Sequence, residues 1–410
     1  MKRLLRALIL ILVRIYGGFG AKKASRRRRL QSAERSPRIL LVRPDHLGDL
    51  IMTTPILQAI KEQLPDAQLT MMIGPWSSEV VAHHPAVDRL LTCPFPGFQR
   101  ATQKALEPYK LLLRTARQLK QSNYDLAINL RPDFWWGAAL LYLAAIPERI
   151  GYATELTTPF LSQALPFPAA EHATISNLRL GSVALQALGA PALIEPYTPA
   201  RYPLYFKPHD DELAWADARL QEAGMSTGKP IVVIHVGTGG AVKLWRNDGW
   251  THIAQLLVND TLLPSPAHVI FTGSKSERPM IEEITAPLQG SALILTETTV
   301  GQLAALIVRA DLVLGVDNGP LHMAAAQDTP SLRLFGPTDA HIFGPWGAPE
   351  RHQVLASTHR CPGCPSIPCG RLDFTAEELP EHPCVRLITD QQVEQAIKML
   401  VGTAAEQAQP

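Results

Sequence analysis

Blocks of apolar positions alternate with polar loops along the chain. The run 39–42 is followed by the loop RPDHLGD and by apolar residues at helical spacing over 56–64. Similar short runs at 69–73 and 126–130 alternate with helical patterns such as 109–120. Short strands that alternate with amphipathic helices predict a parallel sheet covered by helices on both faces.

A second series of the same kind follows a proline-rich stretch near residues 193–209. Its predicted strands are 231–236, 269–271, 292–295, 312–316 and 332–335. A chain of 410 residues is long enough for two such cores. We therefore expect an α/β protein with two Rossmann-like, doubly wound domains that face a central cleft. The expected domains are 37–207 and 208–410, after a separate tail at 1–36, and a closing helix is expected at 390–401.

Candidate chemistry follows the predicted strands, where ligands bind in doubly wound folds. Asp49 lies in the loop after the first strand, where a helix begins. Its carboxylate would be exposed in the cleft or would cap that helix. Thr53 and Thr54, at the following helix start, would be helix caps or ligands of a substrate hydroxyl.

Three further groups follow strands of the second series. A glycine-rich loop, Gly237–Gly240, precedes Lys243, a spacing that suits a phosphate although the P-loop pattern is absent. Glu277 follows the next strand and suits a ribose, or an ordinary turn. The sharpest group is Asp317, Asn318, Gly319 and His322, where a buried strand meets a helix start that would attract a diphosphate. Helix capping by Asp317 or Asn318, and a buried polar role for His322, are the structural alternatives.

The cysteines suggest no disulfide scaffold. Cys361, Cys364, Cys369 and Cys384 have the spacing C-x2-C-x4-C-x14-C within the Cys-rich segment 361–384. Four thiolates would suit a structural zinc site. Because the last interval is proline-rich and loop-like, we favour a surface loop with unligated cysteines.

Positive charge is concentrated at the amino terminus. The stretch 1–29 holds ten Lys or Arg and no acidic residue, so the remainder of the chain is net acidic. Its apolar run, 7–13, is too short to span a bilayer. We expect an interfacial helix on an anionic inner membrane; a cleaved signal peptide and a disordered basic extension are the alternatives. The net acidic remainder argues against a nucleic-acid partner.

Four motifs in order carry a resemblance to a known family. The segments VRPDHLGDLIMTTPILQAIKEQLPDAQLTMMIGP, VIHVGTGG with KLWRNDGWTHIA, VIFTGSKSE, and VLGVDNGPLHMAAA with LFGPTD resemble the signatures of glycosyltransferase family 9, the lipopolysaccharide heptosyltransferases.

The resemblance implies a GT-B fold and an inverting, metal-independent transfer of heptose or a related sugar from an ADP-sugar to a lipid-linked glycan. It makes Asp49 the general base and assigns a phosphate contact to Lys243 and a ribose contact to Glu277. Asp317 would lie near the transferred sugar, and Asn318, Gly319 and His322 would hold the nucleotide. No cofactor is implied, and the expected location is cytoplasmic, peripheral on the inner membrane.

Two other functions are compatible with this domain organisation. A nucleotide-sugar epimerase would share a two-domain cleft and a phosphate loop but would need neither a lipid acceptor nor a basic tail. A non-catalytic, membrane-bound scaffold would keep the fold and the tail, but the joint presence of Asp49, Lys243 and the 317–322 loop argues against it.

Overall fold

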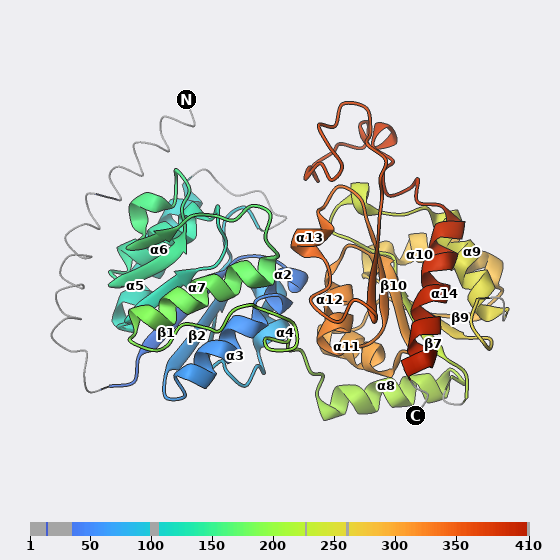
Figure 1. Cartoon of the computed structure of the whole chain (residues 1–410), viewed down its shortest axis with the longest axis horizontal. Coiled ribbons are helices and arrows are strands. Elements are labelled where there is room, and N and C mark those ends of the chain that lie inside the picture. Colours follow the sequence, from blue (N-terminus) through green and yellow to red (C-terminus); the bar gives the residue numbers. More distant parts are fainter. Residues whose placement is uncertain (1–13, 15–34, 99–105, 226–227, 260–261, 408–410) are drawn as a thin grey trace. The chain divides into compact units, whose positions relative to one another are not determined.

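The protein divides into two compact units, Met1–Tyr197 (the N-terminal unit) and Thr198–Pro410 (the C-terminal unit). A computed structural model describes residues 14, 35–98, 106–225, 228–259 and 262–407, with side chains up to residue 402 (Figure 1). Of the expected amino-terminal tail 1–36, only Arg14, Arg35 and Ser36 lie within the described residues. Among the described residues, no helix is both long enough and apolar enough to cross a membrane.

The N-terminal unit is built on a six-stranded sheet in the order β3-β2-β1-β4-β5-β6, and every neighbouring pair is parallel. Its central strands are almost fully buried, as expected when helices cover both faces. The chain order reverses between β1 and β4, which makes their carboxyl ends the switch point of the sheet. The strands are β1 (Arg38–Arg43), β2 (Gln68–Ile73), β3 (Arg89–Thr92), β4 (Leu126–Asn129), β5 (Glu148–Tyr152) and β6 (Gln163–Leu165).

Two pairs of helices pack in the N-terminal unit. Helix α3 (Thr54–Gln63) packs on α7 (Ala173–Ala187), and α5 (Glu107–Gln121) packs on α6 (Trp135–Leu143). Leu40 and Val42 of β1 belong to the core formed with α5 and α6. Because side chains alternate along a strand, the intervening β1 residues face the other layer. The short helices are α2 (Leu47–Ile51) and α4 (Ser78–Val81).

The C-terminal unit repeats the same strand order on a second parallel sheet, β12-β11-β10-β7-β8-β9. Its switch point lies between β7 and β10. The strands are β7 (Ile231–His235), β8 (His268–Thr272), β9 (Ala292–Leu295), β10 (Leu312–Val316), β11 (Ser331–Phe335) and β12 (His352–Ala356). The two doubly wound sheets confirm the predicted α/β fold class.

Helices of the C-terminal unit also form two groups. In the first, α11 (Val300–Arg309) packs on α8 (Asp210–Glu222) and α12 (Gly319–Ala326). In the second, α9 (Asn247–Val258) packs on α10 (Arg278–Thr285) and on the closing helix α14 (Asp390–Gln407), over the core face of β7. The remaining helix is α13 (Ala340–Phe343).

Candidate active site

Three charged side chains meet at the switch point of the N-terminal sheet. Asp45, in the loop after β1, is buried between two guanidinium groups. Its Oδ2 lies 2.6 Å from Nε of Arg43, the last residue of β1, and its Oδ1 pairs with Nη1 of Arg131, just after β4. Adjacent strands that end at one edge of the sheet therefore bring together residues 86 positions apart.

Asp49 lies at the open side of this cluster. Its carboxylate is half-buried on α2, and Oδ1 accepts a hydrogen bond from Nη2 of Arg43 at 3.1 Å. Burial, followed by the negative charge of Asp45, raises the pKa of Asp49 to about 6, although Arg43 and Arg131 lower it. A half-exposed carboxylate with a pKa close to neutrality suits proton transfer.

Arg43 is itself held from several directions. Nη1 donates to the main-chain oxygen of Leu130 at 3.2 Å and to Oδ1 of Asn177 at 3.5 Å. The amide of Asn177, on α7, donates to the carbonyl of Met52 at 3.1 Å. Arg43 and Asn177 thus connect the loops after β1 and β4 to α7, which fixes the group that holds Asp49.

The helix-capping alternatives for this region are wrong. His46 is the N-cap residue of α2, so Asp49 is the third residue of the helix, within its first turn. The hydroxyl of Thr53 donates to the carbonyl of Asp49 at 2.8 Å, and that of Thr54 donates to Ile51 at 2.7 Å. Both threonines are fully buried, and neither hydroxyl caps a helix.

The C-terminal switch point gathers a second set of polar groups. Nζ of Lys243, in the loop after β7, donates to the main-chain oxygen of Asp317 at 2.8 Å and lies 3.1 Å from its Oδ2. Asp317 follows β10, and Oδ2 also accepts from the hydroxyl of Thr338 at 2.7 Å. The main-chain oxygen of Asp317 accepts from Thr238 as well, at 3.2 Å. Lys243 therefore lies beside the loop that precedes α12.

Asn318 connects this loop to the glycine-rich loop. It caps α12, since Oδ1 accepts from the main-chain nitrogen of Leu321 at 3.3 Å, and Nδ2 donates to the carbonyl of Gly237 at 2.9 Å. Gly319 is the first residue of α12, so it lies where free N–H groups face solvent or a ligand. The capping interpretation of Asn318 is confirmed.

Glu277, in the turn after β8, lies next to Gly237. Its carboxylate accepts from the main-chain nitrogen of Ser274 at 2.6 Å and from the Ser274 hydroxyl at 2.8 Å. A Cβ atom at Gly237 would collide with this carboxylate. The structure thus brings Lys243, Glu277, Asp317, Asn318 and Gly319 around the loops after β7, β8 and β10.

His322 lies deeper than these residues. It is buried in α12, and its ring is 3.2 Å from Nη1 of Arg333 on β11. Burial lowers the pKa of the fully buried Arg333 to about 10, while Asp317 raises it. The buried polar alternative therefore describes the His322 environment. Sequence reasoning missed Arg333 because charged residues within a central parallel strand carry no recognisable motif.

The cysteine segment differs from the expected surface loop. Cys361, Cys364 and Cys384 are buried and belong to the core of the C-terminal unit, whereas Cys369 is half-buried. All are free thiols, and Sγ of Cys364 lies 3.3 Å from Nδ1 of His382. Burial and the neighbouring thiols raise the pKa of Cys384 to about 12. In the part of the chain with described side chains, no group of three or more His, Cys, Asp or Glu has metal-binding geometry.

Two doubly wound units, each with polar groups at its switch point, define a class of protein that binds nucleotide-containing ligands. A sequence profile of glycosyltransferase family 9 (heptosyltransferase) matches residues 112–369. The chain belongs to this family and is a glycosyltransferase. Family membership favours transfer over the epimerase and scaffold alternatives.

Curated relatives cover most of the chain. Lipopolysaccharide heptosyltransferase 1 of Pseudomonas aeruginosa is 27% identical over 339 residues, which are 81% of this chain and 87% of the relative. Lipopolysaccharide heptosyltransferase 3 of Escherichia coli K12 is 28% identical over 309 residues, or 73% and 82% of the two chains.

Solved structures support the GT-B fold. A family 9 glycosyltransferase from Veillonella parvula superposes with a TM-score of 0.71 at 20% identity, over 90% of this chain and 99% of the other. The E. coli heptosyltransferase WaaC with ADP superposes with a TM-score of 0.62 at 19% identity, over 88% and 99% of the two chains.

Proposed function

We propose that the protein is an inverting transferase that moves heptose, or a related sugar, from an ADP-sugar to a lipopolysaccharide core or similar glycolipid. The observation that carries the proposal is the half-buried carboxylate of Asp49 at the N-terminal switch point, held by Arg43 and with a raised pKa. The curated relatives support the sugar and the acceptor class, because they are named lipopolysaccharide or lipooligosaccharide heptosyltransferases.

In this mechanism, Asp49 is the general base. An acceptor hydroxyl attacks the anomeric carbon as Asp49 accepts its proton, and the bond from that carbon to the diphosphate oxygen breaks. Attack from the face opposite the leaving group inverts the anomeric centre. The transition state is oxocarbenium-like, so a nearby carboxylate also stabilises its positive charge.

The donor would bind to the C-terminal unit. The leaving diphosphate is negatively charged and needs fixed positive groups. Lys243 and the N-terminus of α12 at Asn318 and Gly319 supply them, and Glu277 accepts from a ribose hydroxyl. Asp317 orients Lys243, and His322 in the first turn of α12 holds this helix end against Arg333. Because these residues meet the need for positive charge, the transfer is proposed to be metal-independent, without zinc at the cysteines.

The acceptor class also suggests a location. A glycolipid acceptor lies in a membrane, and the ADP-sugar is a cytoplasmic type of donor. We therefore place the enzyme on the inner face of the inner membrane as a peripheral protein, with the basic tail 1–36 as one contact.

The test is sugar transfer from ADP-heptose to a heptose-deficient lipopolysaccharide, followed by mass spectrometry in buffer that contains a chelator. We expect product from the wild type. Asp49→Asn should lower kcat about 10²–10⁴-fold, because general-base catalysis contributes on that order. Asp66→Asn, an exposed carboxylate in a turn, is the matched control and should retain full activity.

Three results would contradict parts of the proposal. Full activity of Asp49→Asn removes the assigned base, and loss of wild-type activity in chelator removes metal independence. If the wild type transfers another sugar from a panel of donors but not heptose, the mechanism survives with a different donor.

A further inference from the structure

One exposed face of α5 combines basic and apolar side chains. Leu106, just before the helix, is 58% exposed and Leu113 is 42% exposed, which is high for leucine. Residues at spacings of three and four share a face of a helix. The residues at these spacings form one stripe, namely Leu106, Lys110, Leu113, Arg117 and Lys120.

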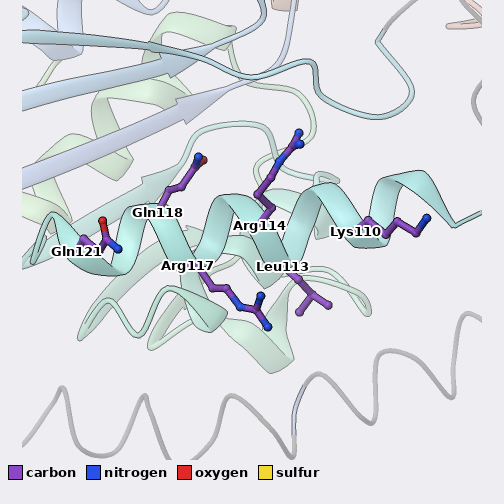
Figure 2. Close-up of a pocket in the computed structure, with 6 residues that line it drawn as sticks. All are labelled: Lys110, Leu113, Arg114, Arg117, Gln118 and Gln121. Carbon is purple, nitrogen blue, oxygen red and sulfur yellow. The ribbon is translucent and has the colours of Figure 1, made fainter.

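The positive charges of this face are largely uncompensated. Lys110 lies 3.4 Å from Glu107, but both side chains are mostly exposed. Within the described part of the chain, Arg114 and Arg117 form no ion pair. Figure 2 shows Leu113 and Arg117 directed to one side of α5, with Arg114 and Gln118 directed to the other.

A pocket adjoins this stripe along edge strand β3. It has a volume of about 720 Å³. Arg114 and Gln118 line both this pocket and the smaller one on α5 that Figure 2 shows. Of the described residues that line it, none is acidic. Its basic residues are Arg38, Arg89 and Arg114, and its apolar residues include Met72, Leu91 and Leu111. Basic groups around an apolar interior fit a phosphate attached to a hydrocarbon chain.

Arg14 of the amino-terminal segment contacts the N-terminal unit at α6. The hydroxyl of Tyr142, on α6, donates to the main-chain oxygen of Arg14 at 2.9 Å. Helix α6 packs directly on α5, with the rings of Trp135 and Tyr109 6.4 Å apart. Like charges repel, so the tail, rich in Lys and Arg, is a poor partner for the basic face of α5, whereas an anionic surface attracts both.

We propose that the exposed face of α5, with the pocket beside β3, docks the N-terminal unit on an anionic phospholipid surface. Leu106 and Leu113 enter the acyl boundary, and Lys110 and Arg117 of the same stripe contact lipid phosphates. Arg114, directed to the other side of α5, contacts a phosphate that enters the pocket. The surface lies outside the candidate active site. The proposal rests on the proposed function only in that a lipid-linked acceptor requires a membrane-bound enzyme.

The experiment is co-sedimentation of the full-length protein with vesicles of phosphatidylcholine alone or with phosphatidylglycerol. Arg114→Glu/Arg117→Glu should weaken binding to the anionic vesicles at least tenfold at low salt. The matched control is Arg386→Glu/Lys398→Glu, two exposed cations of the C-terminal unit, which should bind like the wild type.

A second variant tests the apolar contribution. Leu113→Ser keeps every charge and should bind normally at low salt, but it should lose several-fold more binding than the wild type when salt screens the charges. Thermal melts of both variants should match the wild type, because the side chains are exposed.

Two outcomes would overturn the proposal. The first is wild-type binding of Arg114→Glu/Arg117→Glu to anionic vesicles. The second is displacement of the wild type from vesicles by inorganic phosphate, at an ionic strength where chloride does not displace it, because the pocket would then take a free phosphate. Vesicle binding is measured without sugar transfer, so its failure is distinct from failure of the proposed function. Transfer to a delipidated acceptor should be unchanged in both variants.

Discussion

Asp45 is the residue that most directly shapes the environment of Asp49. Its buried charge raises the pKa of Asp49, while its ion pairs hold Arg43 and Arg131 in place. Its partner Arg131 is distant in sequence, so no local motif could predict the cluster. Asp49 itself could be selected from the sequence because it lies between an apolar run and a predicted helix.

The pH dependence of transfer should show the effect of Asp45 on the pKa of Asp49. Because the base must be ionised, kcat/KM of the wild type should fall about tenfold per pH unit below pH 6. Asp45→Asn removes a negative neighbour and leaves the positive charges of Arg43 and Arg131 uncompensated beside Asp49. Both changes lower the pKa of Asp49, so the acidic limb should move down by on the order of one unit. An unmoved limb in Asp45→Asn would argue against this coupling, and Asp66→Asn serves as the control.

The same carboxylate should weaken the fold at neutral pH. The pKa of Asp49 is raised from 3.8 to about 6 on folding, so the native state favours the protonated form. That contribution to stability is present below pH 4 and is lost as the pH rises through 6. Asp49→Asn should therefore raise the free energy of unfolding by on the order of 1 kcal/mol at pH 8, after allowance for partial solvent exposure, and by much less at pH 4.

Urea denaturation at the two pH values would measure this difference. An Asn variant that is less stable than the wild type at pH 8 would indicate that the Arg43 ion pair outweighs the burial of the carboxylate.

In the glycine-rich loop after β7, a small substitution should weaken donor binding without destabilising the fold. Gly237→Ala places a methyl group on the Glu277 carboxylate, which can swing away because it ends a flexible side chain. We expect a stable protein in which KM for the donor rises about tenfold, since Glu277 leaves its position. Gly239→Ala is the matched control, because its added methyl group would meet no described atom within 4 Å.

Steady-state kinetics of the two glycine variants would show whether Glu277 contacts the donor. An unchanged KM in Gly237→Ala would mean that Glu277 does not contact the donor. Equal losses in both variants would indicate a requirement for backbone freedom in the loop instead.

Elements with continuous apolar runs were predictable, and half-polar ones were not. Strands β7, β8, β10 and β11 appear where the sequence predicts them, because almost all of their residues are buried. Edge strand β9 and the closing helix are only partly buried, but their apolar residues also marked them in the sequence. Strands β3, β6 and β12 lie at sheet edges, where exposed positions interrupt the apolar run. Burial of the cysteines was also missed, because the proline-rich segment has no periodicity that reports packing.

At the scale of the whole molecule, the sequence correctly predicts two doubly wound domains of the same architecture. Each unit presents one switch point, and the predicted residues of the two halves fall at these points. The domain boundary near residue 207 remains a prediction. The roles of the individual site residues also remain predictions, because they depend on ligands and on chemistry rather than on apolar patterning.

The basic tail belongs to this scale too. Deletion of residues 1–34 should weaken binding to anionic vesicles at least tenfold at low salt, because it removes ten positive charges. Binding to neutral vesicles should change less, and transfer to a delipidated acceptor should be retained. Unchanged anionic binding after deletion would support the alternative of an extension without a specific role.

The buried thiols have a practical consequence for the study of the two halves. Cys93 lies in the core of the N-terminal unit, where burial raises its pKa to about 12, and Cys384 lies in the core of the C-terminal unit. Neither should react with an alkylating reagent until its own unit opens. The alkylation rate of each cysteine therefore reports how often its own half of the enzyme opens. Peptide mapping of the labelled cysteines would show whether a nucleotide sugar slows the opening of one half while the other continues to open at its own rate.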